Sequence, residues 1–285
     1  MKRIIGFISF GLLISVFLTG CNRNNVLPLQ LVSIVGYDSE IPVETEYKQW
    51  VSGSYYDEQQ PQNLQVEILG NVLNGSYAYS RIPDKSFLPN HRYKNTQSEI
   101  IEFEVDSEGN VVECYWNGSP PVNSEELSEE ELIETAYNVA TQITGSSLEG
   151  YTSSITYYDN LQLYMVFFTK YLNGIPTADH VRVVLYCDGS PVMFESVLFG
   201  DIPSKTKKIF DLEKVDQNVA NRCDELTEKA RKTYDSVEYS EWSHTLTIDE
   251  KGEYYVLTSV TITCKYAQGE NDLENSIRLE FIQSI

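Results

Sequence analysis

The 285-residue sequence is poor in positive charge and in histidine. Lysine and arginine total 21 against 42 aspartates and glutamates, which gives a formal net charge of -21 at pH 7. A nucleic-acid-binding protein needs a basic surface, so this balance argues against a nucleic-acid partner. Beyond the N-terminus, no apolar run reaches the ~18–20 residues that span a bilayer. The sequence therefore excludes a multi-pass membrane protein.

Motifs of common catalytic sites are also missing. The three histidines, His91, His180 and His244, are far apart and form no HExxH pattern of a zinc enzyme. The sequence holds no loop ending in Gly-Lys-Ser/Thr and no G-x-S-x-G nucleophile elbow. One S-x-x-K match, at 204–207, has no K-T-G element to accompany it. We therefore expect no catalytic residue, no metal site and no cofactor.

The N-terminus has the charge order of a signal peptide. Two basic residues precede an apolar stretch, and Leu-Thr-Gly-Cys follows at 18–21. This tetrapeptide resembles the lipobox of bacterial lipoproteins. The resemblance implies cleavage before Cys21 and a diacylglycerol on its thiol, which would hold the protein on the outer face of the bacterial cell membrane. The alternative is a plain secretory signal followed by an accidental cysteine.

Five segments are expected along the chain. They are a signal peptide at 1–20, a lipidated N-terminus and tether at 21–45, a β-rich region at 46–125, and two α+β units at 126–204 and 205–285. The expected fold class is α+β, with each unit built from a helix and an antiparallel sheet.

Two amphipathic helices mark the two units. Ser128 and the glutamate three residues later form a capping-box pattern, and Asp211 is a good N-cap for the second helix. Ala136 and Val219 occupy equivalent places on the two apolar stripes, and strands follow each helix. The sequence thus predicts a tandem repeat. Two unrelated helix-plus-hairpin segments are the alternative.

Residues 128–199 resemble a PepSY-type module, a small α+β unit of bacterial secreted and membrane-attached proteins. The resemblance rests on four short motifs: Ser-Glu-Glu-Glu-Leu at 128–132, Tyr-Leu-Asn-Gly-Ile-Pro at 171–176, Val-Arg-Val at 181–183 and Asp-Gly at 188–189. The second unit departs from this pattern, because no Ile-Pro follows its Gln-Gly. The resemblance implies an extracytoplasmic binding or inhibitory role and brings no catalytic residues.

Two cysteines are expected to point into the second core. Cys223 lies on the helix stripe, and Cys264 shares a strand face with Val260 and Ile262. They could form a disulfide, which conditions outside the cytoplasm allow. The slightly favoured alternative is that both are small buried apolar residues with free thiols.

Taken together, these features favour a lipid-anchored binding protein without catalysis. Its partner would be an envelope protein or peptide, toward which it would act as an inhibitor or regulator. The acids at 125–131 suit a helix N-terminus better than a calcium loop, and the 20 tyrosines suit sheet packing better than ligand stacking. The alternatives are a substrate-binding lipoprotein of a sugar or peptide transporter and an envelope hydrolase.

Replacing Cys21 tests the anchor. Two acyl chains hold a protein firmly on a bilayer because each buried CH2 contributes about 0.8 kcal/mol. We expect Cys21→Ala to move the protein from the membrane fraction to the soluble fraction, measured by immunoblot after ultracentrifugation. A variant that stays in the membrane fraction would contradict the lipobox assignment.

Overall fold

The computed structural model describes residues 29–35, 54–81, 89–96, 98–119, 126–198, 202, 205–248, 252–268 and 271–285. Within these ranges the chain forms three helices and 13 strands. In chain order they are β1 (Gln30–Val35), β2 (Asn63–Ile68), β3 (Asn71–Arg81), β4 (Asn90–Lys94), β5 (Ile100–Val105), β6 (Val111–Trp116), α1 (Glu129–Thr144), β7 (Tyr151–Tyr158), β8 (Leu163–Leu172), β9 (Ile175–Leu185), β10 (Pro191–Val197), α2 (Leu212–Leu226), α3 (Ala230–Thr233), β11 (Ser236–Ile248), β12 (Tyr254–Gln268) and β13 (Asn271–Ser284).

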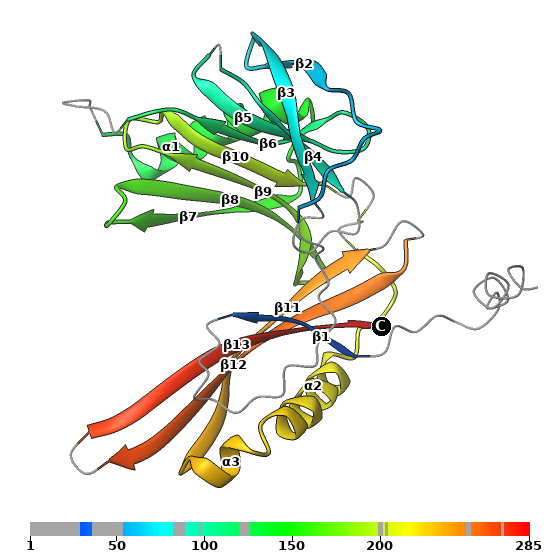
Figure 1. Cartoon of the computed structure of the whole chain (residues 1–285), viewed down its shortest axis with the longest axis vertical. Coiled ribbons are helices and arrows are strands. Elements are labelled where there is room, and N and C mark those ends of the chain that lie inside the picture. Colours follow the sequence, from blue (N-terminus) through cyan, green and yellow to red (C-terminus); the bar gives the residue numbers. More distant parts are fainter. Residues whose placement is uncertain are drawn as a thin grey trace, which may run out of the picture.

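All 13 strands belong to one hydrogen-bonded sheet (Figure 1). The main path runs β1-β13-β12-β11-β9-β10-β6-β5-β4-β3-β2, and β7 and β8 join it through β9. Neighbouring strands are antiparallel, except that β11 and β9 pair in parallel, with Leu246 opposite Thr177. The sheet is therefore mixed, and its two parts, one with β2–β10 and one with β1 and β11–β13, are joined through this single pair of residues.

The expected fold of two tandem α+β units is wrong. The N-terminal strands continue into the first expected unit, because β6 pairs with β10 and places Cys114 opposite Phe194. The strand order also differs between the halves, since β7-β8-β9-β10 leads into β6 whereas β11-β12-β13 leads into β1. One β-dominated sheet replaces the expected tandem repeat.

The wrong prediction of a tandem repeat has a physical reason. The apolar stripe of a helix depends on residues a few positions apart, so it can be found locally in the sequence. The partner of a strand is chosen by backbone hydrogen bonds to a segment that can lie anywhere in the chain, and an open sheet edge accepts such a segment. Strand β1 illustrates this point, because it pairs with β13 from the other end of the sequence (Figure 1).

Helix α1 covers one face of the sheet around β9. Its buried residues Leu132 and Ala136 lie in one core with Val181 and Val183 of β9 and Phe103 of β5. The helix begins as predicted, because the Ser128 side chain accepts from the backbone of the third helical residue and the reciprocal glutamate bond completes the capping box. The helix position is thus fixed by its cap and by the β9 face.

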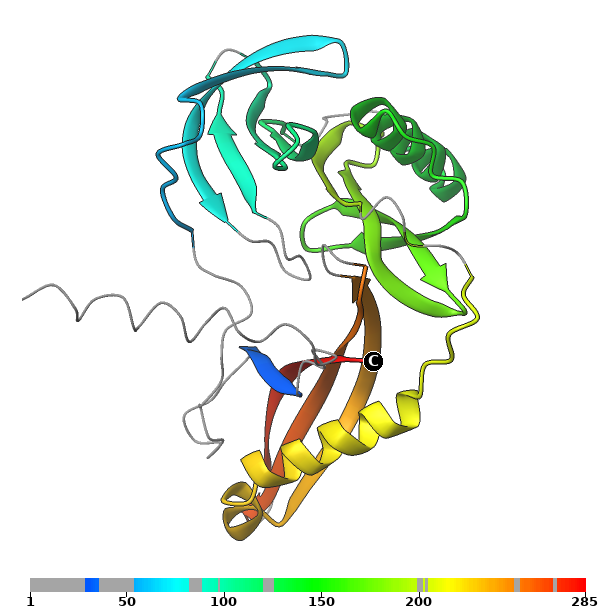
Figure 2. The ribbon, with the colours of Figure 1, turned by 90° about the vertical axis from the view of Figure 1, so that its right-hand side faces the viewer.

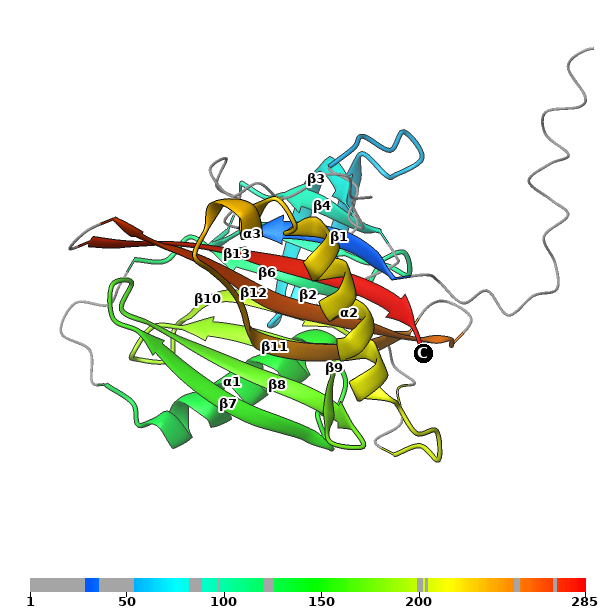
Figure 3. The same cartoon turned by 90° about the horizontal axis from the view of Figure 1, so that it is seen from below.

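Helix α2 lies along the strands β11, β12 and β13 (Figures 2 and 3). Its cap is the predicted one, since the Asp211 side chain accepts from the backbone of Lys214. Val219 and Cys223 are fully buried in a second core. The helix ends at Leu226, with Thr227 as its C-cap, and the short helix α3 begins at Ala230.

Strand β9 connects the two cores. Along its length it pairs with β8, β10 and β11. Leu172 and Ile175, at the turn between β8 and β9, pack into the core beneath α2. The chain between the halves is also held in place, because the Asn173 side chain donates to the Thr206 carbonyl over 3.1 Å and Lys208 donates to the Ile285 carbonyl over 2.6 Å.

Gly75 of β3 offers a test of the packing between β3 and β5. A Cβ atom at this position would lie 2.5 Å from Phe103 Cζ and 2.7 Å from Tyr93 Cβ. Alanine favours a strand more than glycine does, so only this contact can make the substitution harmful. We expect Gly75→Ala to lower the free energy of unfolding by about 1–3 kcal/mol, measured by urea denaturation.

The matched control is Asn74→Ala, which changes the neighbouring exposed position of the same strand. It should leave the stability within about 0.5 kcal/mol of the original. Equal stabilities for the two variants would mean that β3 and β5 do not approach as closely as described.

Candidate functional site

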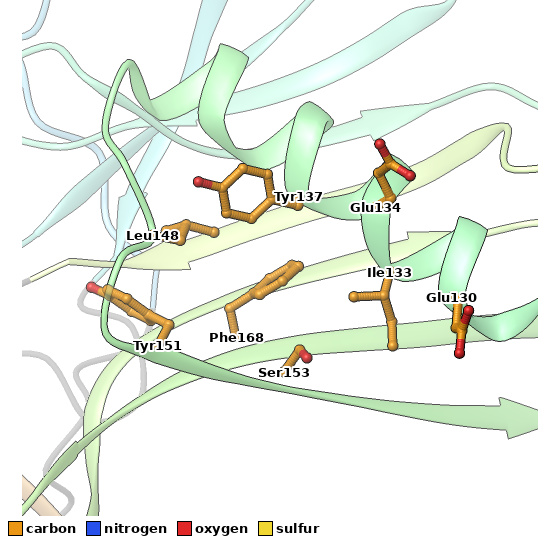
Figure 4. A pocket seen from close by; sticks show the side chains of 8 residues that line it. All are labelled: Glu130, Ile133, Glu134, Tyr137, Leu148, Tyr151, Ser153 and Phe168. Atoms are coloured by element: carbon orange, nitrogen blue, oxygen red, sulfur yellow. The ribbon is translucent and has the colours of Figure 1, made fainter.

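An open pocket lies between helix α1 and strand β7, and Figure 4 shows it from close by. Its volume is about 310 Å³. The centre is apolar, because Leu148 and Phe168 are almost fully buried and the Tyr137 ring meets the Phe168 ring edge-on, with 6.1 Å between the centroids. The lining residues are Glu130, Ile133, Glu134, Tyr137, Leu148, Tyr151, Ser153 and Phe168.

The helix side of the pocket carries negative charge. Glu130 and Glu134 line it, Glu129 is the first residue of the same helix, and Glu126 lies two residues before its N-cap. Within the described residues, none of these four glutamates has an ion-pair partner, although the neighbouring Glu131 is used in the capping box. The wall therefore presents carboxylates that are available to a cationic ligand.

The other side of the pocket is strand β7, which ends the sheet. It pairs with β8 only, and within the described ranges no strand occupies its outer edge. Strand side chains alternate between faces, so Tyr151 and Ser153 in the pocket share a face with Ile155 and Tyr157. This inner face of β7 runs beside α1 for roughly 20 Å.

A buried carboxylate lies behind the pocket. Asp179 of β9 is fully buried and accepts a hydrogen bond from the Tyr151 hydroxyl. The Lys170 ammonium is 3.6 Å from its other oxygen. Burial raises the pKa of Asp179 despite these two partners, and it also raises the pKa of the Tyr151 hydroxyl, together with the hydrogen bond to Asp179. In Figure 4 the hydroxyl of Tyr151 points away from Ser153 and Phe168, so the ring lines the pocket while its oxygen is held from behind.

A second cluster of charges crosses the face of the sheet that lies opposite α1. Residues placed directly across neighbouring strands there are, in order, Arg92, Glu104, Glu113, Glu195 and Arg182. The side chains of Glu104 and Glu113 are only 1% and 3% exposed. Three glutamates lie in a row, so the repulsion between their carboxylates must be offset by the arginines that flank them.

These charges neutralise one another. Arg92 Nε lies 2.6 Å from Glu104 Oε1, and Arg81 bonds to both Glu104 and Glu113. Burial raises the pKa of Glu104, but the two guanidinium groups outweigh it and hold the pKa below its ordinary value. Burial and the adjacent Glu104 raise the pKa of Glu113. Since its charges are already paired, this cluster fixes the register of β4, β5 and β6 and is not the functional site.

Glu130, from the acidic run singled out in the sequence, lines this pocket, whereas the candidate lipidation, histidine and cysteine residues do not line it. Cys21, Glu125 and Ser204 lie outside the described residues. The histidines serve local contacts, such as the 2.7 Å hydrogen bond between His91 Nδ1 and Ser80 Oγ. Cys223 and Cys264 are both free thiols in the core beneath α2.

Among the residues that the structure describes, no cluster of three or more histidine, cysteine, aspartate and glutamate side chains is placed to hold a metal ion. No helix in the described ranges is long and apolar enough to cross a membrane.

Sequence reasoning missed the open edge of β7 and the buried Asp179. Strand β7 carries a usable signal, because its eight residues, YTSSITYY, contain neither a charge nor a proline. Edge strands are usually protected by such residues. Asp179 also carries a signal, because strand alternation places it on the same face of β9 as the apolar residues Val181 and Val183. Nothing in the sequence says that the two lie side by side.

The raised pKa of Asp179 gives a pH-dependent prediction. The folded state holds the Asp179 proton more tightly than the unfolded state, so this group stabilises fully at low pH and loses its contribution as pH rises through the raised pKa. Asp179→Asn keeps an oxygen for the Tyr151 hydroxyl and cannot ionise. We expect the melting temperature of the variant, relative to the original protein, to rise between pH 3 and pH 7.

Thermal denaturation across this pH range measures the effect, with Asp159→Asn in the exposed turn after β7 as the control. If the melting temperature of Asp179→Asn relative to the original protein stays constant or falls as the pH rises, Asp179 is not held in its neutral form.

The chain was compared with known proteins. Neither a family model nor a curated protein matches its sequence. Among solved structures, the Bacillus megaterium YpeB C-terminal domain aligns at 13% identity with a TM-score of 0.30, over 76% of this chain and 91% of that one. An uncharacterized protein from Eubacterium rectale aligns at 13% identity with a TM-score of 0.36, over 73% of each chain. Both TM-scores are below 0.5, so these alignments define neither the family nor the function of this chain.

Proposed function

We propose that this chain is an extracytoplasmic binding protein that receives an extended polypeptide segment along strand β7. Acyl chains on Cys21 would hold it at the outer face of the bacterial membrane. The bound segment would belong to an envelope protein or peptide, which the binding regulates without any catalytic step.

The observation that carries the proposal is the unprotected edge of β7. An exposed edge presents unpaired backbone N–H and C=O groups that can pair with another chain. Proteins usually block such edges with lysine, proline or a bulge, and β7 has none of them over eight residues in regular register with β8. The other terminal strands are less suited, because β2 carries Glu67 and β1 has an irregular register with β13.

The pocket beside β7 adds selectivity, which an open strand edge does not provide by itself. Backbone pairing gives affinity with little selectivity, and pockets for alternate side chains give specificity. The apolar centre formed by Ile133, Leu148 and Phe168 suits an aromatic or branched aliphatic side chain. A segment added to β7 would direct every second side chain toward α1, and one of these would enter the pocket.

A synthetic heptapeptide with phenylalanine at its centre and threonine elsewhere tests this proposal. We expect it to bind the full-length protein and to slow amide hydrogen exchange in 151–158. Ser153→Tyr, which fills the pocket, should weaken binding at least about tenfold, measured by fluorescence anisotropy.

The matched control is Ser154→Tyr, because Ser154 is the neighbouring exposed residue on the opposite face of β7. It should leave binding unchanged. Two N-methylated versions of the peptide complete the test: methylation of one alternate set of amides should abolish binding, and methylation of the other set should not. If both sets are tolerated, or if the two serine variants behave alike, the segment does not bind by strand addition at this pocket.

A further inference from the structure

Two tyrosines, the exposed Tyr157 and the half-buried Tyr164, form an aromatic platform where the inner face of β7 meets β8. Tyr157 lies directly across from Tyr164 of β8, and their ring centroids are 4.7 Å apart with the planes tilted by 35°. Tyr157 is 46% exposed. Strand alternation places it on the same face as Ser153 in the pocket. The platform and the pocket therefore face the same bound segment.

Carboxylates stand beside this platform. Burial and Tyr157 are the larger causes that raise the pKa of the Tyr164 hydroxyl, and the negative charges of Glu126 and Glu129 add to them. The backbone places them there, because the Leu127 N–H donates to the Cys187 carbonyl over 2.9 Å and Leu185, two residues before Cys187, lies directly across from Tyr164. Both glutamates are exposed, and within the described residues neither has an ion-pair partner.

Aromatic faces flanked by carboxylates suit one kind of side chain. A guanidinium group stacks on a tyrosine ring and at the same time donates hydrogen bonds to carboxylates in a planar fork. An ammonium group has the charge but cannot stack in the same way. An acidic or apolar side chain would leave Glu126 and Glu129 without compensation.

We propose that the platform of Tyr157 and Tyr164, with Glu126 and Glu129, binds an arginine of the segment that pairs with β7. This inference rests on the proposed function and narrows it to a class of ligand. Ser153 and Tyr157 are four residues apart on β7, roughly 14 Å. The arginine must therefore lie four residues from the apolar side chain that enters the pocket, in either chain direction.

Peptides that differ only in spacing test the inference. The first carries phenylalanine and an arginine four residues later, with threonine elsewhere. The second has the arginine three residues later, which turns it to the opposite face, and the third replaces the arginine of the first by glutamine. We expect the first to bind the full-length protein about fivefold more tightly than the other two. This advantage should shrink in 0.5 M salt, because the Debye length at that ionic strength lies between roughly 3 and 10 Å and the exposed charges are then screened from one another.

Variants of the protein locate the effect. Tyr157→Ala, and separately Glu126→Gln combined with Glu129→Gln, should reduce binding of the first peptide to that of the glutamine peptide. Tyr158→Ala is the matched control, because Tyr158 is similarly exposed, at 40%, on the opposite face of β7. It should leave the advantage of the first peptide intact.

Three outcomes separate a failure of the arginine inference from a failure of the proposed function. If the three peptides bind equally and Ser153→Tyr still weakens them, the strand-addition site holds and the arginine inference is wrong. If Tyr158→Ala removes the arginine advantage as fully as Tyr157→Ala, the arginine does not sit on this platform. If no peptide responds to Ser153→Tyr, the proposed function itself fails.

Discussion

The hydrogen bonding of strand β9 is the constraint on which the rest of this molecule depends. Its backbone pairs with β8 on one side and with β10 and β11 on the other, so both cores are joined through one strand. Its side chains Val181 and Val183 hold helix α1. Because a strand has only two edges, β10 and β11 must share one of them, and the sheet divides at this point into the part under α1 and the part under α2.

The position of the candidate site follows from this arrangement. Helix α1 is fixed over β9, and two strands further along the sheet ends at β7, so the helix overlaps an open edge. An apolar pocket beside unpaired backbone groups results from this overlap. Asp179 of β9 adds to it, since it holds the Tyr151 hydroxyl and so orients a ring that lines the pocket. A buried carboxylate is costly unless it is hydrogen-bonded, and its presence here ties the edge strand to the central one.

Charged residues are buried and paired on one face of the sheet and exposed and unpaired on the helix that covers the other. On the face opposite α1, Arg81 and Arg92 neutralise Glu104 and Glu113, and removing one partner would leave a buried charge uncompensated. Along α1 the carboxylates of Glu130 and Glu134 are exposed and unpaired among the described residues. Paired buried charges fix strand register, whereas unpaired exposed ones remain available to a ligand. Because of this contrast, the proposed function is assigned to the face of the sheet that carries α1 and the pocket.

The sequence alone determined the local features of this protein. The cap of α1 at Ser128 and the cap of α2 at Asp211 follow from residues within a few positions of one another, and the structure has both. The sequence alone did not determine which strands pair with one another. The β6–β10 and β1–β13 pairings, the single sheet and the neighbourhood of Tyr151 and Asp179 depend on hydrogen bonds between segments far apart in the chain. Local periodicity carries no information about such pairings, so the sheet, its open edge and the site beside it were decided only by the tertiary structure.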